Sequence, residues 1–363
     1  MFLAPKKIDW YIFRKFMGTF FVALLLIIGI VIIFDVSEKI DDFVEKKAPL
    51  NSIIFDYYLN FIPYFINMYS PMFVFITVIF VTSKLASNSE IIAILSGGIS
   101  FHRMMRPYLL AASIITLLSL GLNLFVIPNS NKETVKFEQK YMKEKPKKTN
   151  RNIHYQIAPG EFVYAESFSS WNNTAYRFTL EKIEDSKLVS KISAETAVYD
   201  TLKGCWTLKK YFMRTFNDDL TDNIKSGRQL DTIIPLTVKD FYFSENTVTT
   251  LTYKELNEMI EIQEMRGDAN VKYALIEKNT RFSLPFSAFI LTIMGVALSS
   301  RKRRGGIGWN IALGIALAFT YILFMRFSQM FVHTDVMSPA VALWLPNVVF
   351  AIIAMVLYRW APK

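Results

Sequence analysis

The sequence predicts an α-helical membrane protein with six transmembrane helices, arranged as three and three around an inserted all-β domain. The main observation is that six long runs contain no Asp, Glu, Lys or Arg. Each is long enough to cross a hydrocarbon core of about 30 Å, which takes about 20 helical residues. The second observation is that residues 132–250 change to short apolar–polar alternations separated by turn residues, a pattern typical of β-strands. The six runs are 17–34, 57–83, 107–131, 282–300, 305–325 and 338–358.

The composition also indicates a membrane protein rather than a soluble one. Hydrophobic residues make up 52% of the 363 residues, and the mean hydropathy is +0.27. The first charge-free run follows four basic residues, as a signal peptide does. However, it leads into Asp35 and Glu38 without a small-residue cleavage site. We therefore expect it to be retained as the first span.

The net charge of +10 reports topology rather than a nucleic-acid partner. Four short segments hold 13 Lys and Arg against two acids, Asp9 and Glu90, whereas residues 132–281 hold 24 against 22. Six spans place the four segments on one face, which is the positive-inside pattern. We therefore expect both termini to be cytoplasmic and the β domain to lie outside the cytoplasm. The four segments are 1–16, 83–107, 300–306 and 359–363.

The chain divides into four parts on this interpretation. Residues 1–131 form an N-terminal membrane half, 132–250 the β domain, 251–281 a helical connector, and 282–363 a C-terminal half with spans 4 to 6. Within these parts we expect an interfacial helix over 1–16 and a short external loop over 40–52.

Proline and small residues give the spans further features. Pro63 and Pro71 predict kinks in span 2, where neighbouring helices must satisfy the freed carbonyls. Gly308, Gly314 and Ala318 are small residues that permit close helix contact along span 5.

The inserted segment predicts strands at roughly ten-residue spacing, which leaves an all-β sandwich, a jelly roll or a half-open barrel open. Cys205 is the only cysteine, so no intrachain disulfide forms, and we expect it to be a strand residue. A capping-box start at Thr252 and Glu255 predicts a connector helix that ends at Gly267. The predicted strands are 155–157, 161–164, 176–180, 197–199, 205–208 and 241–243.

No catalytic or cofactor motif occurs in the sequence. The three histidines are far apart, and no phosphate loop, HExxH or nucleophile elbow is found. Residues 95–98 spell LSGG, as in the signature loop of ATP-binding-cassette ATPases, but no nucleotide-binding fold fits between two spans. Gly97 and Gly98 instead suit the end of a short helix. Any ATP is expected to be bound by a partner.

The cytoplasmic segment 84–102 is the candidate contact for that partner. Glu90 is its only acid. It is either part of a solvated polar face or a carboxylate offered to a basic residue of a cytoplasmic ATPase. In the second case the neighbouring apolar residues, among them Ile91, Ile92, Ile94 and Leu95, fill a groove on the partner. Arg326, at the outer end of span 5, either pairs or snorkels within the protein or contacts a lipid phosphate.

Four stretches resemble one known family. They are Ser89-Glu90-Ile-Ile-Ala with Ser-Gly-Gly-Ile-Ser100, Glu277-Lys278 with Ser283-Leu-Pro285-Phe, Gly314-Ile-Ala-Leu-Ala, and Leu345-Pro346-Asn347. With the order of three spans, β domain and three spans, they resemble the permease family of the lipopolysaccharide export system, the LptF/LptG type. The resemblance covers essentially the whole chain.

The resemblance implies a non-catalytic subunit of an ATP-binding-cassette exporter in the bacterial inner membrane. Such a permease pairs with a paralogous permease subunit over a cytoplasmic ATPase dimer and extracts lipopolysaccharide. Its periplasmic, jelly-roll-like β domain passes the lipid to bridge proteins of the LptC/LptA type. The family's coupling helix falls within 84–102, and its lipid-contacting basic residue on Lys39, although Asp35, Glu38, Asp41 and Asp42 depart from the pattern there. The implied coupling residues are Ser89, Glu90, Ile91, Leu95, Gly97 and Gly98.

Two other functions stay open at this point. One is a membrane-anchored periplasmic scaffold that binds lipid or lipoprotein without energy coupling. The other is an exporter of lipoprotein or another amphiphile. The segment 84–102 argues against a mere anchor, which needs only a short basic turn between spans.

Overall fold

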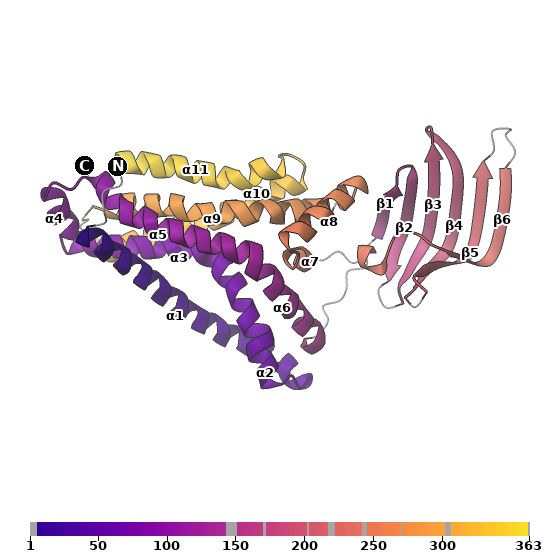
Figure 1. Cartoon of the computed structure of the whole chain (residues 1–363), viewed down its shortest axis with the longest axis horizontal. Coiled ribbons are helices and arrows are strands. Elements are labelled where there is room, and N and C mark those ends of the chain that lie inside the picture. The colour runs from indigo at the N-terminus through magenta and orange to yellow at the C-terminus, as the bar shows by residue number, and fades with distance from the viewer. Residues whose placement is uncertain are drawn as a thin grey trace. The chain divides into compact units, whose positions relative to one another are not determined.

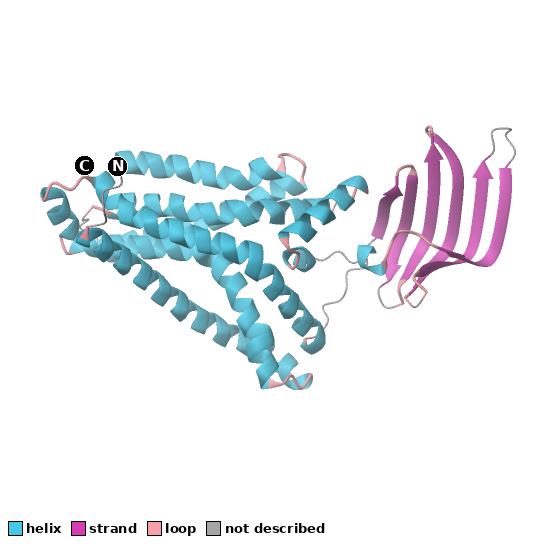
Figure 2. Cartoon of the chain, viewed as in Figure 1, coloured by secondary structure: helices cyan, strands magenta, loops and turns pink. Residues whose placement is uncertain are grey.

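The computed structural model describes residues 6–142, 151–169, 172–201, 203–216, 222–241, 245–268, 270–301 and 306–361. The chain forms two compact units, one helical and one built mainly of strands (Figure 2). The helical unit comprises Met1–Lys143, Thr249–Tyr253 and Leu275–Lys363, and the β unit comprises Glu144–Val248 and Lys254–Ala274.

The helical unit contains the six spans that the sequence predicts. Among the described residues, six helical stretches are long and apolar enough to cross a membrane, three before and three after the strands (Figure 1). The elements are α1 (Lys7–Glu45), α2 (Leu50–Ser52), the π-helical η1 (Ile53–Tyr58), α3 (Leu59–Ser87), α4 (Glu90–Ser96), α5 (Phe101–Gly121), the π-helical η2 (Leu122–Val126), α6 (Ile127–Tyr141), α9 (Val271–Ser299), α10 (Gly306–His333) and α11 (Pro339–Arg359).

Helix α1 is longer than the sequence pattern suggests. Residues 7–16, expected as an interfacial helix, are its first turns, and residues 40–45 of the expected external loop are its last. The cause is tertiary packing, because Phe43 is buried against Tyr57, Tyr58 and Phe137 and extends the helix beyond the apolar run. The loop is reduced to the few residues between α1 and α2.

Buried polar side chains join the helices inside the unit. Asn67 of α3 donates to Asn123 of η2 at 2.8 Å and accepts from Ser119 of α5 at 2.5 Å. Asn123 in turn donates to the backbone carbonyl of Arg281 in α9 at 3.4 Å. Pro63 and Pro71 both lie inside α3, which continues through them. Hydrogen bonds of this kind hold helices together where no water competes.

The small residues of span 5 differ in how closely they pack against other helices. A Cβ on Gly314 would lie 2.3 Å from Ile79 Cδ1, so α10 approaches α3 closely at this point. Ala318, one turn further along, is buried. Gly308 faces open space. Close contact along span 5 is thus confirmed at Gly314 and Ala318, but it does not extend to Gly308.

The described residues of the β unit form one antiparallel sheet, in which each strand pairs with the next along the chain, together with short helices. Five of the six predicted strands lie within β1 to β5, and Cys205 begins β5. For the sixth, 241–243, Phe241 ends a 3-10 turn, and 242–243 fall outside the described residues. The elements are β1 (Arg151–Ala158), β2 (Glu161–Ser169), β3 (Thr174–Glu184), β4 (Lys187–Asp200), β5 (Cys205–Phe216), β6 (Asp222–Thr232), η3 (Val238–Phe241), α7 (Glu245–Thr249) and α8 (Tyr253–Met265).

The segment 234–241 covers part of one face of the sheet. Trp206 donates its indole N–H to the carbonyl of Leu236 at 2.8 Å, and Phe168 stacks on Phe241 with ring centroids 4.5 Å apart. In the ranges that the structure describes, one sheet carries the apolar face. The expected inserted all-β domain is thus confirmed in the form of one six-stranded antiparallel sheet.

The fit at Gly314 gives a first prediction. Gly314→Leu forces its side chain into Ile79 and should destabilise the helical unit by about 1–3 kcal/mol, as overpacking does. The matched change Gly308→Leu meets open space and should leave stability nearly unchanged. Thermal unfolding of the two variants in detergent measures the difference; equal melting temperatures would contradict the proposed α3–α10 contact.

Candidate functional site

Helix α4 is a short element whose two ends are fixed by the backbone. Ser89, with φ 61°, makes the left-handed turn that separates it from α3. At the other end Gly98 has φ 80°, a conformation that glycine adopts without strain. The N–H of Gly98 donates to the carbonyl of Leu95, and that of Ile99 to the carbonyl of Ile94. This is a Schellman cap, so the structure places Gly97 and Gly98 at the end of a helix as expected.

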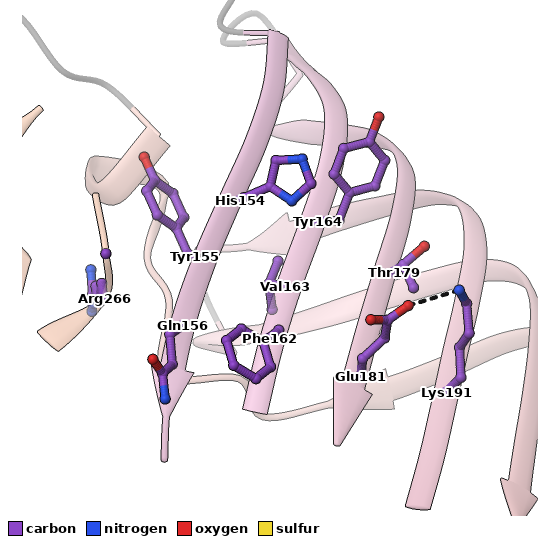
Figure 3. Close-up of a pocket in the computed structure, with 11 residues that line it drawn as sticks. His154, Tyr155, Gln156, Phe162, Val163, Tyr164, Thr179, Glu181, Lys191 and Arg266 are labelled. Carbon is purple, nitrogen blue, oxygen red and sulfur yellow. Dashed lines mark ion pairs between the residues drawn. The ribbon is translucent and has the colours of Figure 1, made fainter. Parts of the chain in front are cut away.

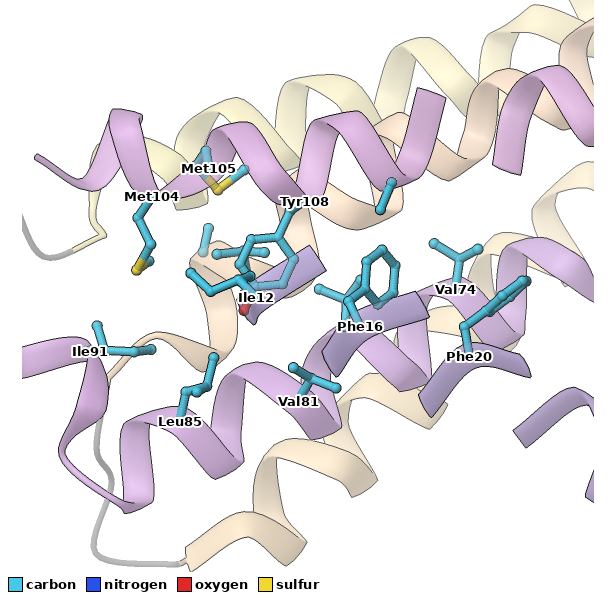
Figure 4. Close-up of a cluster of buried hydrophobic side chains, with 14 of the residues drawn as sticks. Ile12, Phe16, Phe20, Val74, Val81, Leu85, Ile91, Met104, Met105 and Tyr108 are labelled. Atoms are coloured by element: carbon cyan, nitrogen blue, oxygen red, sulfur yellow. The ribbon is translucent and has the colours of Figure 1, made fainter. Parts of the chain in front are cut away.

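One side of α4 is anchored in the helical unit. Ile91 is 1% exposed and, together with Ile94, belongs to a buried cluster that includes Ile12 of α1 and Met104 of α5 (Figure 4). Ile91 and Ile94 therefore position the helix, and the expectation that they fill a partner's groove does not fit this geometry. Leu95 is half-buried. The exposed positions are Ile92, Ala93, Ser96, Gly97 and Gly98.

Glu90, the first residue of α4, is bonded to α1. Its Oε2 accepts the hydroxyl hydrogen of Tyr11 at 2.9 Å, and its Oε1 accepts from Asn88 Nδ2 at 3.1 Å. Lys15 Nζ lies 3.5 Å from Oε1 and also donates to the Tyr11 hydroxyl at 2.7 Å. The carboxylate is neither fully solvated nor free, since α1 already supplies it with a cation and a donor.

These contacts keep Glu90 ionised. Burial by itself raises the pKa of its carboxyl, but the hydrogen bonds from Asn88 and Tyr11 and the charge of Lys15 outweigh it, so the pKa lies below its ordinary value. A carboxyl with a lowered folded pKa contributes stability above its unfolded pKa and loses it as the pH falls through the folded one. The link to α1 is therefore complete at neutral pH.

A second contact joins the same region, and sequence reasoning missed it. Arg103, in the first turn of α5, binds Asp9 of α1 through two parallel bonds of 2.6 and 2.5 Å. Asp9 also caps α1 by accepting the backbone N–H of Lys6. The available signal was that Asp9 and Glu90 are the only two acids of the four basic segments. Both acids turn out to be paired within the chain.

Lys39, the candidate lipid contact of span 1, is already paired. Its ammonium group lies 2.6 Å from Asp35 Oδ1, one turn earlier in α1. It also contacts the Tyr57 hydroxyl and lies 4.8 Å from the centroid of that ring. Tyr58 completes the group by donating to Asp35 Oδ2 at 3.1 Å. Asp35, one of the nearby acids that depart from the family pattern, is therefore the ion-pair partner of Lys39.

Arg326 of α10 is exposed. Its Nη2 lies 4.0 Å from the Met68 sulfur of α3. Within the described ranges no carboxylate pairs with it, unlike Lys39. Of the two candidate lipid contacts, Arg326 is thus the one whose charge is available.

The β unit has a shallow cavity of about 560 Å³ beside β1. The His154 ring packs at a tilt against that of Tyr164 there, with centroids 4.6 Å apart, and Glu181 pairs with Lys191 at 2.7 Å (Figure 3). The carbonyl of Arg266, after α8, accepts the N–H of Gln156 and closes one side. This arrangement contains no nucleophile–base pair. No cluster of three metal-ligating side chains was found among the residues that the structure describes.

The cap of α4 gives a second prediction. Gly98→Ala places a Cβ on a left-handed residue, which costs about 1–2 kcal/mol, and should speed amide hydrogen exchange in α4 by about 5- to 30-fold. Gly121→Ala, at a helical position with open space around it, should not. Hydrogen exchange followed by mass spectrometry reports both; unchanged protection in Gly98→Ala would show that the cap is dispensable.

Comparison with known proteins agrees with this architecture. The family model "Lipopolysaccharide export system permease LptF/LptG" matches residues 10–360, which is nearly the whole chain. No curated protein matches the chain. The match includes all six spans, α4 and the β unit. The chain therefore belongs to the LptF/LptG family of lipopolysaccharide export system permeases.

Proposed function

We propose that this chain is the permease subunit of an ABC-type lipopolysaccharide exporter, powered by a separate cytoplasmic ATPase dimer. Membership of the family makes it a component of lipopolysaccharide export. The observation that supports ATP coupling is α4, a capped helix between spans 2 and 3 that is anchored on one side and exposed on the other. Its exposed residues are small or apolar, which suits a groove on another protein.

The charge distribution supports the orientation. The segments around α4, at the start of α1, between α9 and α10 and at the end of α11 carry the excess positive charge. By the positive-inside rule this face is cytoplasmic, so both termini and α4 face the ATPase. The β unit then lies in the periplasm, where it passes lipid to bridge proteins of the LptC/LptA type.

The apolar face of the sheet supports a role in holding acyl chains. Val163, Leu180, Ile192 and Met213 stand opposite one another on β2 to β5. The last three are only half-buried, whereas the other end of this face is filled by Trp206 and its neighbours. A half-covered apolar row of this kind gains stability when a lipid chain covers it.

The outer surfaces of α1 and α10 support a route for lipid between paired subunits. Both helices expose large apolar side chains, such as Leu26 on α1 and Phe319 and Phe327 on α10. Arg326 lies beside this apolar surface with its charge available. We place the entry of lipopolysaccharide between α1 and α10 of this subunit and a paralogous permease subunit.

A scaffold without energy coupling is the alternative. It would need no ordered helix between spans 2 and 3 and no exposed apolar residue on it. The 55% exposure of Ile92 on a helix whose other side is anchored favours the coupled function.

Docking on α4 gives a third prediction. Ile92→Glu should abolish co-purification with the cognate cytoplasmic ATPase, because it places a charge on the face that enters the partner without touching Glu90. Ile233→Glu, an equally polar change at a residue 86% exposed in the β unit, is the control. Pull-down from detergent and ATP-driven lipopolysaccharide release from proteoliposomes are the measurements. Normal association of Ile92→Glu, or absence of any ATPase from the wild-type preparation, would refute ATP coupling through α4.

The two candidate lipid contacts give a fourth prediction. Arg326→Gln should lower photocrosslinking to a photoactivatable lipopolysaccharide several-fold, because it removes a cation that pairs with no carboxylate in the described part of the chain. Lys39→Gln should change the yield little, because Asp35 already neutralises the lysine. Adduct yields in membranes, normalised to protein, compare the two. The assignment fails if Lys39→Gln has the larger effect or if Arg326→Gln has none.

A further inference from the structure

We infer that two polar contacts couple α4 and the start of α5 to the first turns of α1, so that a displacement of α4 moves span 1. The first is Glu90 with Tyr11 and Lys15, and the second is Arg103 with Asp9. We call these five residues the α1–α4 clamp. Tyr11, Lys15, Asp9 and Arg103 are then positioning residues for transport, a role that rests on the proposed function.

The first contact of the clamp draws on one face of α1. Tyr11 and Lys15 are separated by four residues, so they lie on the same side of the helix and one turn apart. The 2.7 Å bond between them holds the tyrosine hydroxyl in place to donate to Glu90. The hydroxyl thus links a cation and an anion that are themselves 3.5 Å apart. Removing the Tyr11 hydroxyl therefore removes both its hydrogen bond to Glu90 and the hydrogen bond that it accepts from Lys15.

The segment between spans 2 and 3 is held near both of its ends. Glu90 is the first residue of α4, and Arg103 is in the first turn of α5, whose start Ser100 caps by accepting the N–H of Arg103. The Schellman turn at Gly98 joins the two helices in a fixed geometry. Because Arg103 binds both carboxylate oxygens of Asp9, the contact fixes the orientation of the two side chains as well as the distance between them.

Apolar side chains fill the space between the two contacts. Ile12 of α1 points toward the region where Ile91 of α4 and Met104 of α5 meet (Figure 4). All three are almost completely buried. A seven-residue helix has little stability of its own, so its position follows from these anchors. The clamp and the cluster together connect α4 to the start of α1, so that the two move as one rigid body.

Helix α1 is suited to carry such a displacement. It is a single helix of 39 residues, about 58 Å long at about 1.5 Å per residue. Its cytoplasmic half packs in the cluster with Ile12, Phe16 and Phe20, while Leu25 and Leu26 are exposed on its other side. A shift imposed at Tyr11 is therefore passed along a continuous rod to the surface where we place lipid entry.

The clamp can be tested in the chain alone. The full-length protein in nanodiscs, with Cys205→Ser, receives spin labels at Ser96→Cys on α4 and Gly18→Cys on α1; both positions are exposed. The double variant Tyr11→Phe/Lys15→Gln should broaden the distance distribution measured by pulsed electron paramagnetic resonance, and Arg103→Gln should do so independently. Lys7→Gln removes an exposed lysine of α1 that lies outside the clamp, and it should leave the distribution narrow. A narrow distribution in both clamp variants overturns the inference.

The role of the clamp in transport is tested by a separate measurement. In the complex with the ATPase, Tyr11→Phe/Lys15→Gln should assemble and hydrolyse ATP normally but release several-fold less lipopolysaccharide per ATP than wild type or Lys7→Gln. An unchanged ratio would show that the clamp does not transmit motion, while leaving the proposed function intact. Failure of the wild-type complex to release lipid at all would instead contradict the proposed function.

Discussion

The hydrocarbon interior of a bilayer offers no water to peptide N–H and C=O groups, so each must find its partner within the chain. This constraint makes the six charge-free runs helical, and it makes buried side-chain polar groups bond to other groups of the protein, as Asn67, Asn123 and Ser119 do. This constraint ends at the membrane surface, where water can solvate charged side chains. The clamp around Glu90 and the Lys39–Asp35 pair belong to these surface zones, at opposite ends of the same helix α1.

Helix α4 combines two requirements that usually conflict. The proposed function requires this helix to be held firmly enough to transmit a force and to leave a surface for another protein. The sequence EIIAILS meets both, because Ile91 and Ile94 turn inward while Ile92 and Ala93 turn outward. Glu90 adds a polar connection to α1 that does not use the exposed face. The acid first considered as a partner contact is therefore, in this structure, an internal one.

Sequence reasoning predicted what depends on local pattern and missed what depends on distant contacts. The spans, the Gly98 turn and five strands follow from local hydropathy and backbone preference. The polar edge strand β6 has no alternation and is defined by its pairing with β5. The extension of α1 depends on Phe43 packing against aromatic residues from later helices. Tyr11 and Glu90 are 79 residues apart, so no spacing rule reveals their bond. Asp35 and Lys39 lie at helical spacing, and in the sequence the acids near Lys39 stood out only as a departure from the family pattern.

In the proposed function, ATP hydrolysis by a separate protein drives lipopolysaccharide onto the β unit of this chain. The most direct measurement places a photocrosslinking amino acid at Met213, in the half-buried apolar row, and follows adducts in proteoliposomes that contain the complete complex. The account predicts that adducts with lipopolysaccharide increase with time only when ATP and an active ATPase are present. Equal adduct formation without ATP, or with an ATPase unable to hydrolyse it, would contradict the account.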